Sequence, residues 1–549
     1  MSYSRFALRG ICISSVIALA ACKSSPIVKS PAAPARPIIV SPGDWPSYNR
    51  TLLGDRYSPL AEINVANVAG LRTICSYTLP EVTSLQTGPI VVNGTMFFTT
   101  DTISYAIDAS SCVERWKTVR HSETPSGLGV NRGFAYMNGR LFRGTSDVHA
   151  IALDATDGRV VWDQVLDVKG PGVSIPMAPI AANGLVYIGN AGGDIAAITG
   201  HVYALDARDG HVVWKFDVVP SSGPARSTWP NIRLPVSGGA FWTSFTLDAP
   251  NAILYVPAGN PAPDFDAELR KGDNLYANSV IALSSNSGRL LAWNQLVKRD
   301  AHDWDVDSPP ALVTTRSGRA IVASANKDGL LSILDRSRVT HAPSDPSSTL
   351  SLLSQTPTTT RFNVDAPLSR NRTTHFCPGI QGGNEWNGAA YSPQTNALYT
   401  GSVDWCANVQ LKRDTINIPM PGAGYWFGAE TPQAQIMDPP DRARGWLTAF
   451  DAENGSVRWK YQAPRPMLAA VTPTAGGVIF AADMGGQLYA FDASNGRVLW
   501  QTNSGQSTGG GIVTYIAGGR QLVGVASGMK SPVWPGGSTQ SRILVLGLR

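Results

Sequence analysis

The sequence has few charged residues and few cysteines. Lys, Arg, Asp and Glu make up 15% of its 549 residues, the net charge is +5, and six cysteines are present. Lys and Arg never gather into a run, so the charge indicates a mildly basic soluble surface and no nucleic-acid partner. The pattern Cys-x-x-Cys-His is missing, which excludes a covalently attached c-type haem in this sequence.

The N-terminus carries the one apolar stretch of note. Arg5 and Arg9 precede an apolar segment from Ile11 to Ala21, and Cys22 follows. A basic start, a short apolar segment and small residues before a cleavage point describe a signal peptide over residues 1–21, not a membrane span. The ending Leu-Ala-Ala-Cys resembles a bacterial lipobox. We therefore expect Cys22 to become lipid-modified; the alternative is an ordinary signal peptide with a chance cysteine.

The segment that follows differs from the rest of the chain. Residues 22–42 are rich in Pro, Ser and Ala without periodicity, which predicts an extended tether. Residues 43–549 are then one domain. We expect it in the bacterial periplasm on a lipid anchor, with Lys23 mildly consistent with outer-membrane sorting.

Four cysteines remain once the signal peptide and the lipid site are set aside. In an oxidising compartment four cysteines allow three pairings. We predict disulfides Cys75–Cys112 and Cys377–Cys406, because each closes a short segment of sequence.

One phrase recurs along the domain: a small residue, an apolar residue, Asp, several polar residues, Gly and then Trp. Its copies end at Trp116, Trp162, Trp214, Trp459 and Trp500, with a degenerate copy at Trp293. Asp and Gly form a tight turn between strands, and Trp on the next strand packs between sheets. Repeats of about 40–50 residues are typical of propeller blades. The sequence predicts an all-β, eight-bladed β-propeller with tryptophan-docking repeats, and long surface loops over 340–376 and 412–443.

The segment from His302 to Pro309 is unusually acidic. Asp303, Asp305 and Asp307 fall within five positions and would project on one side of a strand or tight loop. Like charges this close raise one another's pKa unless a cation neutralises them. The segment is either a solvated acidic turn or a metal site, and oxygen ligands suit a hard cation such as Ca²⁺.

Several spaced motifs resemble, in order, those of the bacterial quinoprotein alcohol dehydrogenases, which depend on pyrroloquinoline quinone (PQQ). The first runs from Asp44-Trp45 to Leu71-Arg72, and the second runs from Trp242 through Asp248 to the Gly-Asn-Pro-Ala-Pro of 259–263. Asn-Lys-Asp-Gly at 326–329 and Asn-Glu-Trp-Asn-Gly at 384–388 extend the likeness. It covers about residues 43–549 and indicates a lipoprotein form without a haem domain.

The resemblance implies roles for individual residues. Asp305 matches the catalytic base and is also a metal ligand, and Asn260 matches a metal-binding Asn. Asp194 stands where the family has a metal-binding Glu, and Asp307 resembles the extra carboxylate of lanthanide-using relatives. The metal is therefore Ca²⁺ or a lanthanide.

The cofactor residues follow in the same way. Trp242 matches the floor beneath the planar quinone, although a lone Trp is more often a core residue. Arg132 and Lys327 match positions that contact the cofactor's oxygens. The remaining expected contacts are Gln86, Gly192, Gly193, Asn384, Trp386 and Trp534. Gln86 replaces a usual Glu, and Ser126–Gly129 stand in place of an adjacent-Cys pair.

The implied activity is oxidation of an alcohol to an aldehyde or ketone, with electrons passed to an external cytochrome c or quinone. Three alternatives stay open. The first is a propeller that kept the motifs but lost activity, which Gln86 and Asp194 favour, and two more concern function. One is a non-catalytic propeller scaffold lipoprotein of outer-membrane assembly, and the other is a sugar-oxidising quinoprotein.

Overall fold

The computed structural model describes residues 40–124, 128–167, 170, 172–230, 234–343, 345–413 and 424–548. The predicted signal peptide, Cys22 and most of the predicted tether lie outside these ranges, and so do Ser126 and Gly127. No helix within the described ranges is long and apolar enough to cross a membrane.

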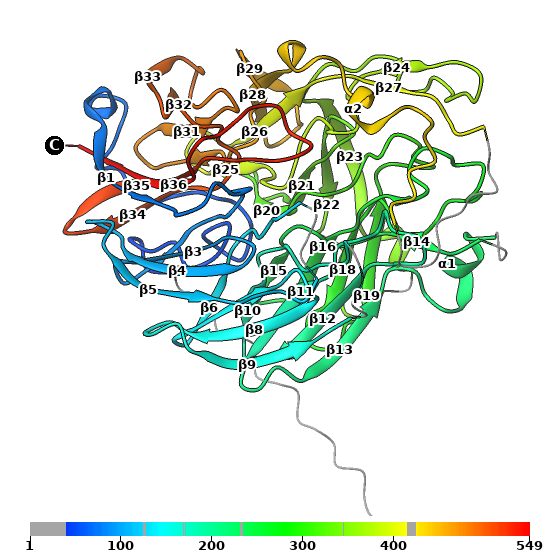
Figure 1. Cartoon of the computed structure of the whole chain (residues 1–549), viewed down its shortest axis with the longest axis horizontal. Helices are drawn as coiled ribbons and strands as arrows, with labels where there is room; N and C mark the ends of the chain where they lie inside the picture. Colours follow the sequence, from blue (N-terminus) through cyan, green and yellow to red (C-terminus); the bar gives the residue numbers. More distant parts are fainter. Residues whose placement is uncertain are drawn as a thin grey trace, which may run out of the picture. The chain divides into compact units, whose positions relative to one another are not determined.

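Strands of the described ranges form eight antiparallel four-stranded sheets, the blades of the predicted propeller (Figure 1). The first four blades each run from an inner to an outer strand. Blade 1 holds β2 (Ile90–Val92), β3 (Thr95–Thr99), β4 (Ile103–Asp108) and β5 (Glu114–Val119); blade 2 holds β6 (Ala135–Met137), β7 (Arg140–Gly144), β8 (His149–Asp154) and β9 (Val160–Val165); blade 3 holds β10 (Ile180–Ala182), β11 (Leu185–Gly189), β12 (His201–Asp206) and β13 (Val212–Asp217); blade 4 holds β15 (Thr246–Asp248), β16 (Ile253–Pro257), β18 (Ser279–Ser284) and β19 (Leu290–Gln295).

The other four blades repeat this order. Blade 5 holds β20 (Ala311–Thr314), β21 (Ala320–Ala325), β22 (Leu330–Asp335) and β23 (Ser351–Pro357); blade 6 holds β25 (Ala390–Ser392), β26 (Ala397–Asp404), β28 (Arg444–Asp451) and β29 (Val457–Ala463); blade 7 holds β30 (Thr472–Pro473), β31 (Val478–Ala482), β32 (Gln487–Asp492) and β33 (Val498–Asn503); blade 8 holds β34 (Ile512–Ala517), β35 (Arg520–Ser527), β36 (Arg542–Gly547) and β1 (Arg72–Thr78). The predicted fold is confirmed.

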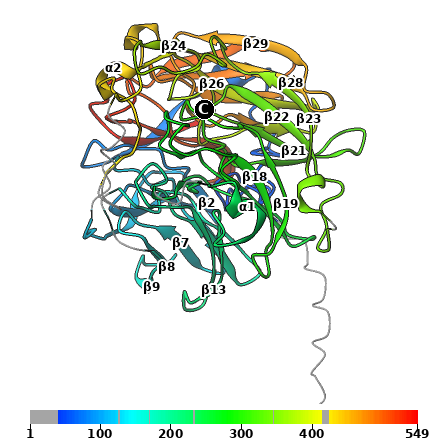
Figure 2. The same ribbon diagram turned by 90° about the vertical axis from the view of Figure 1, so that its right-hand side faces the viewer.

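Several short elements lie outside the eight four-stranded sheets. Two small sheets pair β14 (Ser237–Gly238) with β17 (Pro261–Ala262) and β24 (Thr374–Phe376) with β27 (Ala407–Val409); the helical segments are α1 (Gly223–Ser227), α2 (Gln433–Ile436), η1 (Val68–Gly70), η2 (Pro346–Ser348) and η3 (Pro440–Arg442). Figure 2 shows α2 beside β24, where Met437 bridges to Ala407.

The repeat phrase works by joining neighbouring blades. The Trp162 indole N–H of blade 2 donates to the carbonyl of Ala207 in blade 3 at 3.1 Å. The repeat glycine of the next blade, Gly210, has φ +82° and lies so close to the Trp162 ring that a Cβ would meet it at 2.7 Å. Trp116, Trp214 and Trp459 make the same pair of contacts with the blade that follows each.

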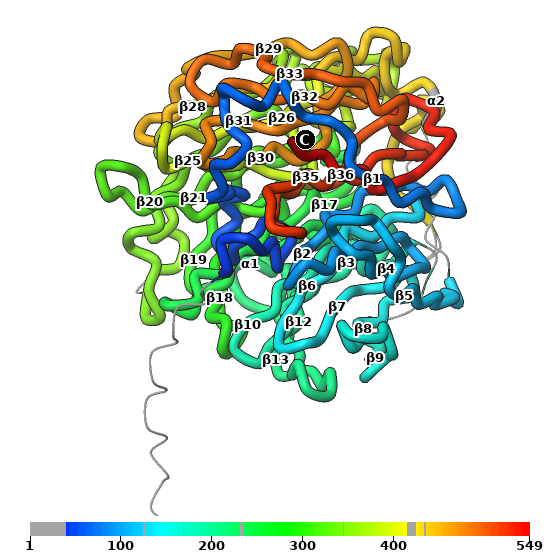
Figure 3. Tube along the Cα trace, turned by 90° about the vertical axis from the view of Figure 1, so that its left-hand side faces the viewer, coloured from blue at the N-terminus to red at the C-terminus, as the bar shows by residue number. Residues whose placement is uncertain are grey.

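The two ends of the ring meet in blade 8. Its outermost strand is β1, which pairs antiparallel with β36 (Figure 3). The Cys75–Cys112 disulfide then ties β1 to the turn between β4 and β5 of blade 1, and Cys377–Cys406 links the β24–β27 pair. Both predicted disulfides are confirmed.

One loop prediction was wrong in part. The stretch 340–376 contains β23, the outer strand of blade 5, because Ser351–Pro357 pairs antiparallel with β22.

Candidate active site

The site residues come from loops at one end of the blades. Gln86, Arg132, Trp242, Asp305 and Trp386 each lie in the segment that leads into the inner strand of a blade. Other site residues follow the second strand of a blade, as Asp194, Asn260 and Lys327 do. Because inner strands of successive blades contact one another around the axis, these loops converge.

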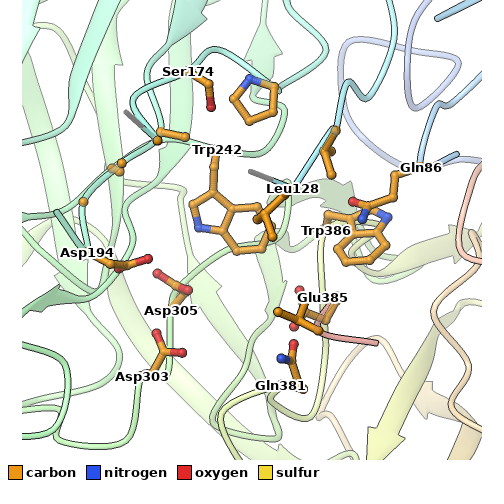
Figure 4. A pocket seen from close by; sticks show the side chains of 18 of the residues that line it. Gln86, Leu128, Ser174, Asp194, Trp242, Asp303, Asp305, Gln381, Glu385 and Trp386 are labelled. Carbon is orange, nitrogen blue, oxygen red and sulfur yellow. The ribbon is translucent and has the colours of Figure 1, made fainter. Parts of the chain in front are cut away.

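They enclose a cavity of about 190 Å³. The predicted residues that line it are Gln86, Arg132, Gly192, Gly193, Asp194, Trp242, Asn260, Asp305, Lys327, Trp386 and Trp534. Figure 4 shows Trp242 between two groups: Asp194, Asp303 and Asp305 on one side, and Gln86, Glu385 and Trp386 on the other.

A buried guanidinium lies on the aromatic side of the cavity. Arg132 stacks over the rings of Trp242 and Trp386 at 4.8 and 4.9 Å. It donates to the Gln86 side-chain oxygen at 2.8 Å and to the Trp242 carbonyl at 3.0 Å. Burial lowers the Arg132 pKa to about 10. Its Nε has no hydrogen-bond partner, and no carboxylate of the described ranges pairs with it.

The opposite wall is built around Lys327. Its ammonium donates to Asp305 Oδ2 at 3.0 Å and contacts Asp303 Oδ2 at 3.2 Å. Asp305 Oδ1 accepts the backbone N–H of Asn260 at 2.8 Å. Gly259 permits this approach, because a Cβ there would lie 2.5 Å from Asp305 Oδ1. Both oxygens of Asp305 are therefore held by donors.

Local turn chemistry presents the acidic segment to the cavity. The Asp300 carboxylate accepts the backbone N–H groups of His302 and Trp304 at 3.0 and 3.1 Å, which closes a tight turn. Asp303 takes a left-handed conformation, φ 62°, which Asp tolerates better than most residues. Asp303 and Asp305 thus both reach Lys327.

Three carboxylates gather at the edge of this wall. One oxygen from each of Asp194, Asp264 and Asp303 lies within 4.8 Å of the others. The Asn260 side-chain amide donates to Asp264 Oδ1 at 3.1 Å. Burial, followed by the charge of Asp305, raises the Asp194 pKa to about 6, and burial with neighbouring carboxylates raises the pKa of Asp264 and of Asp303 well above the ordinary value.

The structure does not bring two predicted residues to the cavity wall. The Asn384 amide instead faces Thr358 Oγ1 at 2.6 Å and the Gly401 carbonyl at 2.9 Å. Asp307 is buried, and neither of its carboxylate oxygens has a hydrogen-bond partner within the described ranges. The regular one-sided projection expected of the acidic segment fails at Asp307, because residues 300–310 form no strand and the chain bends at His302.

Sequence reasoning also missed residues. Glu385, Gln381 and Ser174 line the cavity, and Asp264 lies behind its wall. Asp303, expected only as part of the acidic segment, also lines it. Burial raises the Glu385 pKa to about 8. Nothing in the sequence indicated that Glu385 rather than its neighbour Asn384 lines the cavity, because both lie in a region of bends and turns and not in a strand.

The residues present fit a planar, polyanionic cofactor and a hard cation. The buried guanidinium has donor capacity left over, and Trp242 offers an aromatic face. The gathered carboxylates offer oxygen ligands that need a positive charge between them.

Comparison with known proteins agrees with this geometry. The family model "Glucose/ethanol/alcohol dehydrogenase, beta-propeller domain" (PQQ) matches residues 45–343, more than half of the chain. The chain belongs to this family. Within it, the chain is 28% identical to the dehydrogenase subunit of a quinone-type alcohol dehydrogenase from Gluconacetobacter polyoxogenes, over 89% of this chain and 72% of the relative.

Other members of the PQQ dehydrogenase family are similarly close. A lanthanide-dependent methanol dehydrogenase from Methylacidiphilum fumariolicum is 27% identical over 89% of this chain and 85% of its own length. The crystal structure of the quinohemoprotein alcohol dehydrogenase from Comamonas testosteroni superposes with a TM-score of 0.81 at 26% identity, over 92% of this chain and 80% of that one.

A second family model, "Outer membrane protein assembly factor BamB", matches residues 443–529. This range holds strands of blades 6 to 8 and none of the residues that line the cavity. It reflects the shared repeat and does not favour a scaffold function.

Proposed function

We propose that this family member oxidises an alcohol to an aldehyde or ketone with PQQ as cofactor, a metal ion beside the quinone, and Asp305 as general base. One observation carries the proposal. A carboxylate, held by Lys327 and the Asn260 N–H, faces the same cavity as a guanidinium that no carboxylate of the described residues pairs with.

The chain's own groups would hold the cofactor as follows. Arg132 pairs with anionic oxygens, and the Trp242 ring supports the planar system. Gln86, Trp386 and Trp534 close the remaining sides of the cavity, and their bulk excludes water. When bound, PQQ supplies a two-electron acceptor and the metal supplies a Lewis acid.

Asp305 takes the hydroxyl proton of the alcohol. Its Oδ2 already accepts from Lys327, whose ammonium holds the carboxylate in its orientation. Burial lowers the Lys327 pKa, but Asp303 and Asp305 outweigh this, so its pKa lies well above the ordinary value. Lys327 therefore stays charged while Asp305 changes protonation, and the base returns to its starting orientation after each turnover.

Related alcohol and methanol dehydrogenases support the alcohol as substrate. We further propose that the chain is exported to the periplasm, lipid-modified at Cys22 and tethered by residues 22–42 to the outer membrane. Electrons leave to an external cytochrome c or quinone. A Cys22→Ala variant that still enters the membrane fraction would contradict the anchor.

The decisive experiment uses the purified protein with PQQ and either Ca²⁺ or a lanthanide. Dye reduction is assayed over a panel of alcohols and sugars, and PQQ binding is followed by quenching of tryptophan fluorescence. For Asp305→Asn we expect PQQ affinity close to wild type and kcat lower by about three orders of magnitude. Asp157→Asn, in an exposed turn, is the control. Failure of wild type to bind PQQ with either metal would refute the enzyme proposal.

A further inference from the structure

Asp264 is the most deeply buried member of the three-carboxylate cluster. It has no exposed surface, whereas sequence motifs singled out only Asp194, Asn260, Asp305 and Asp307 for the metal. Its Oδ1 accepts from the Asn260 amide, while its Oδ2 has no hydrogen-bond partner in the described part of the chain. Asp264 is thus a buried anion with an unused oxygen.

Within the described ranges no Lys or Arg side chain pairs with that oxygen. Arg270, the nearest cation to act on Asp264, donates to its backbone carbonyl at 3.2 Å and not to its carboxylate. Lys327 is engaged by Asp303 and Asp305. A buried carboxylate that faces two others without a cation is strongly unfavourable. We therefore expect a positive charge to lie between Asp194, Asp264 and Asp303.

We propose that Asp264 is a direct ligand of the metal ion of this site, together with Asp194, Asp303 and the side chain of Asn260, and that Asp307 is not. This inference rests on the proposed function, because it concerns the metal of the same site. Of the ligands expected from the sequence motifs it keeps Asp194 and Asn260, and it adds Asp303 and, from the loop after β17, Asp264.

The surroundings of Asp307 support the contrast. Asp307 is equally buried, yet its oxygens do not join those of Asp194, Asp264 and Asp303. The charge that acts on it most is that of Glu385, which Figure 4 shows across the cavity from Asp194. A cation at the three-carboxylate cluster therefore lies on the side of the cavity away from Glu385.

The charges of the side chains around the cluster influence which metal ion can bind there. Asp194, Asp264, Asp303 and Asp305 bring four carboxylates, and Lys327 brings one positive charge. A lanthanide and Ca²⁺ share the preference for such oxygen ligands, so both are included in the test.

The test measures Tb³⁺ binding to the full-length, PQQ-free protein by luminescence excited through tryptophan, since Trp242 lines the same cavity. Ca²⁺ is then titrated to displace Tb³⁺. The variants are Asp264→Asn and, as a matched control, Asp307→Asn: each removes one buried carboxylate without changing its shape. Thermal unfolding of the metal-free forms checks folding, and Asp264→Ser is a second variant should Asp264→Asn fail to fold.

We expect Asp264→Asn to weaken Tb³⁺ binding at least about fivefold more than Asp307→Asn does, and to shrink the Tb³⁺-induced rise in unfolding temperature. A smaller difference, or a greater loss in Asp307→Asn, overturns the assignment. PQQ binding is measured separately on the same samples. Loss of the Asp264 effect with PQQ binding intact contradicts this inference alone, whereas wild type that binds Tb³⁺ but never PQQ contradicts the proposed function.

Discussion

Arg132 is the residue whose surroundings say most about the ligand of this cavity. A guanidinium buried among Trp242, Trp386 and Gln86 has lost most of its hydration, and no carboxylate in the described part of the chain pairs with it. Such an arrangement is costly unless an anion binds. The planar fork of arginine also fixes the direction from which a carboxylate can approach.

Arg132→Lys tests this role. Lysine keeps the charge but loses the fork and the stacking on two indoles, so we expect PQQ affinity to fall about tenfold or more. Quenching of tryptophan fluorescence measures the affinity, and Arg208→Lys on the surface is the control. Wild-type affinity in Arg132→Lys would show that the guanidinium does not contact the cofactor.

Glu385 makes cofactor binding sensitive to pH. Burial raises its pKa to about 8, so it is mostly neutral at neutral pH and ionises in mildly alkaline solution. Ionisation places a negative charge in the cavity that receives a ligand with three carboxylates. We expect PQQ affinity to fall roughly tenfold between about pH 6.5 and 8.5 in wild type, and to stay nearly constant in Glu385→Gln.

Fluorescence titrations at several pH values measure this difference. Asp328→Asn, which removes another buried acid outside the cavity wall, should retain the wild-type slope. An unchanged slope in Glu385→Gln would assign the pH effect to another group.

Individual residues also mark the limit of sequence reasoning. Trp242, Arg132, Lys327 and Asp305 could be found because each stands in a motif with fixed spacing. Asp264 could not, since its importance arises from its distance to two carboxylates on other loops. The sequence predicted a cofactor contact at Asn384 and not at its neighbour Glu385, because sequence alone does not determine which of two adjacent side chains faces the cavity.

At the scale of elements, the tryptophan repeat forms the contact that joins each sheet to the next. The indole of one blade needs both a carbonyl acceptor and a glycine in the next, as Trp162 has in Ala207 and Gly210. This explains why the spacing of the phrase predicted blades correctly. It also explains why β23 was missed: its strand carries no tryptophan, and the sequence Ser-Leu-Leu-Ser-Gln-Thr-Pro has no repeat phrase.

Gly210→Ala tests this contact, with Gly184→Ala as a matched control. Both glycines have nearly the same φ, +82° and +81°, so both substitutions bring the same backbone strain. A Cβ at 210 would meet the Trp162 ring, whereas a Cβ at 184 meets nothing within 4 Å. We expect Gly210→Ala to lower the free energy of unfolding by about 1–3 kcal/mol more than Gly184→Ala does. Equal losses in urea unfolding would mean that the contact contributes nothing.

At the scale of the whole molecule, ring closure brings the site together from almost the full length of the chain. Gln86 lies in blade 1, and Trp534 lies in blade 8, where β1 returns to pair with β36. The order of motifs was readable in advance, but the distances between loops of different blades depend on how eight sheets pack around one axis. The carboxylate cluster is a product of that packing.

The packing concentrates buried acids, and this fixes how stability depends on pH in the metal-free protein. Burial raises the pKa of Glu385 to about 8 and that of Asp328 to about 7. Raised carboxyl pKa values mean that the folded state binds more protons than the unfolded state up to those values, so stability falls as pH rises through them. Burial lowers the pKa of His302 to about 4, so its contribution to the free energy of unfolding changes mainly at lower pH.

We therefore expect the free energy of unfolding of the metal-free protein to decrease by roughly 3 kcal/mol between about pH 6.5 and 8.5. Thermal or urea unfolding across this range measures the change, and Asp328→Asn should reduce it by about a third, since its lower pKa makes it the smaller contributor. Stability that rises with pH would show that these acids are already ionised at neutral pH.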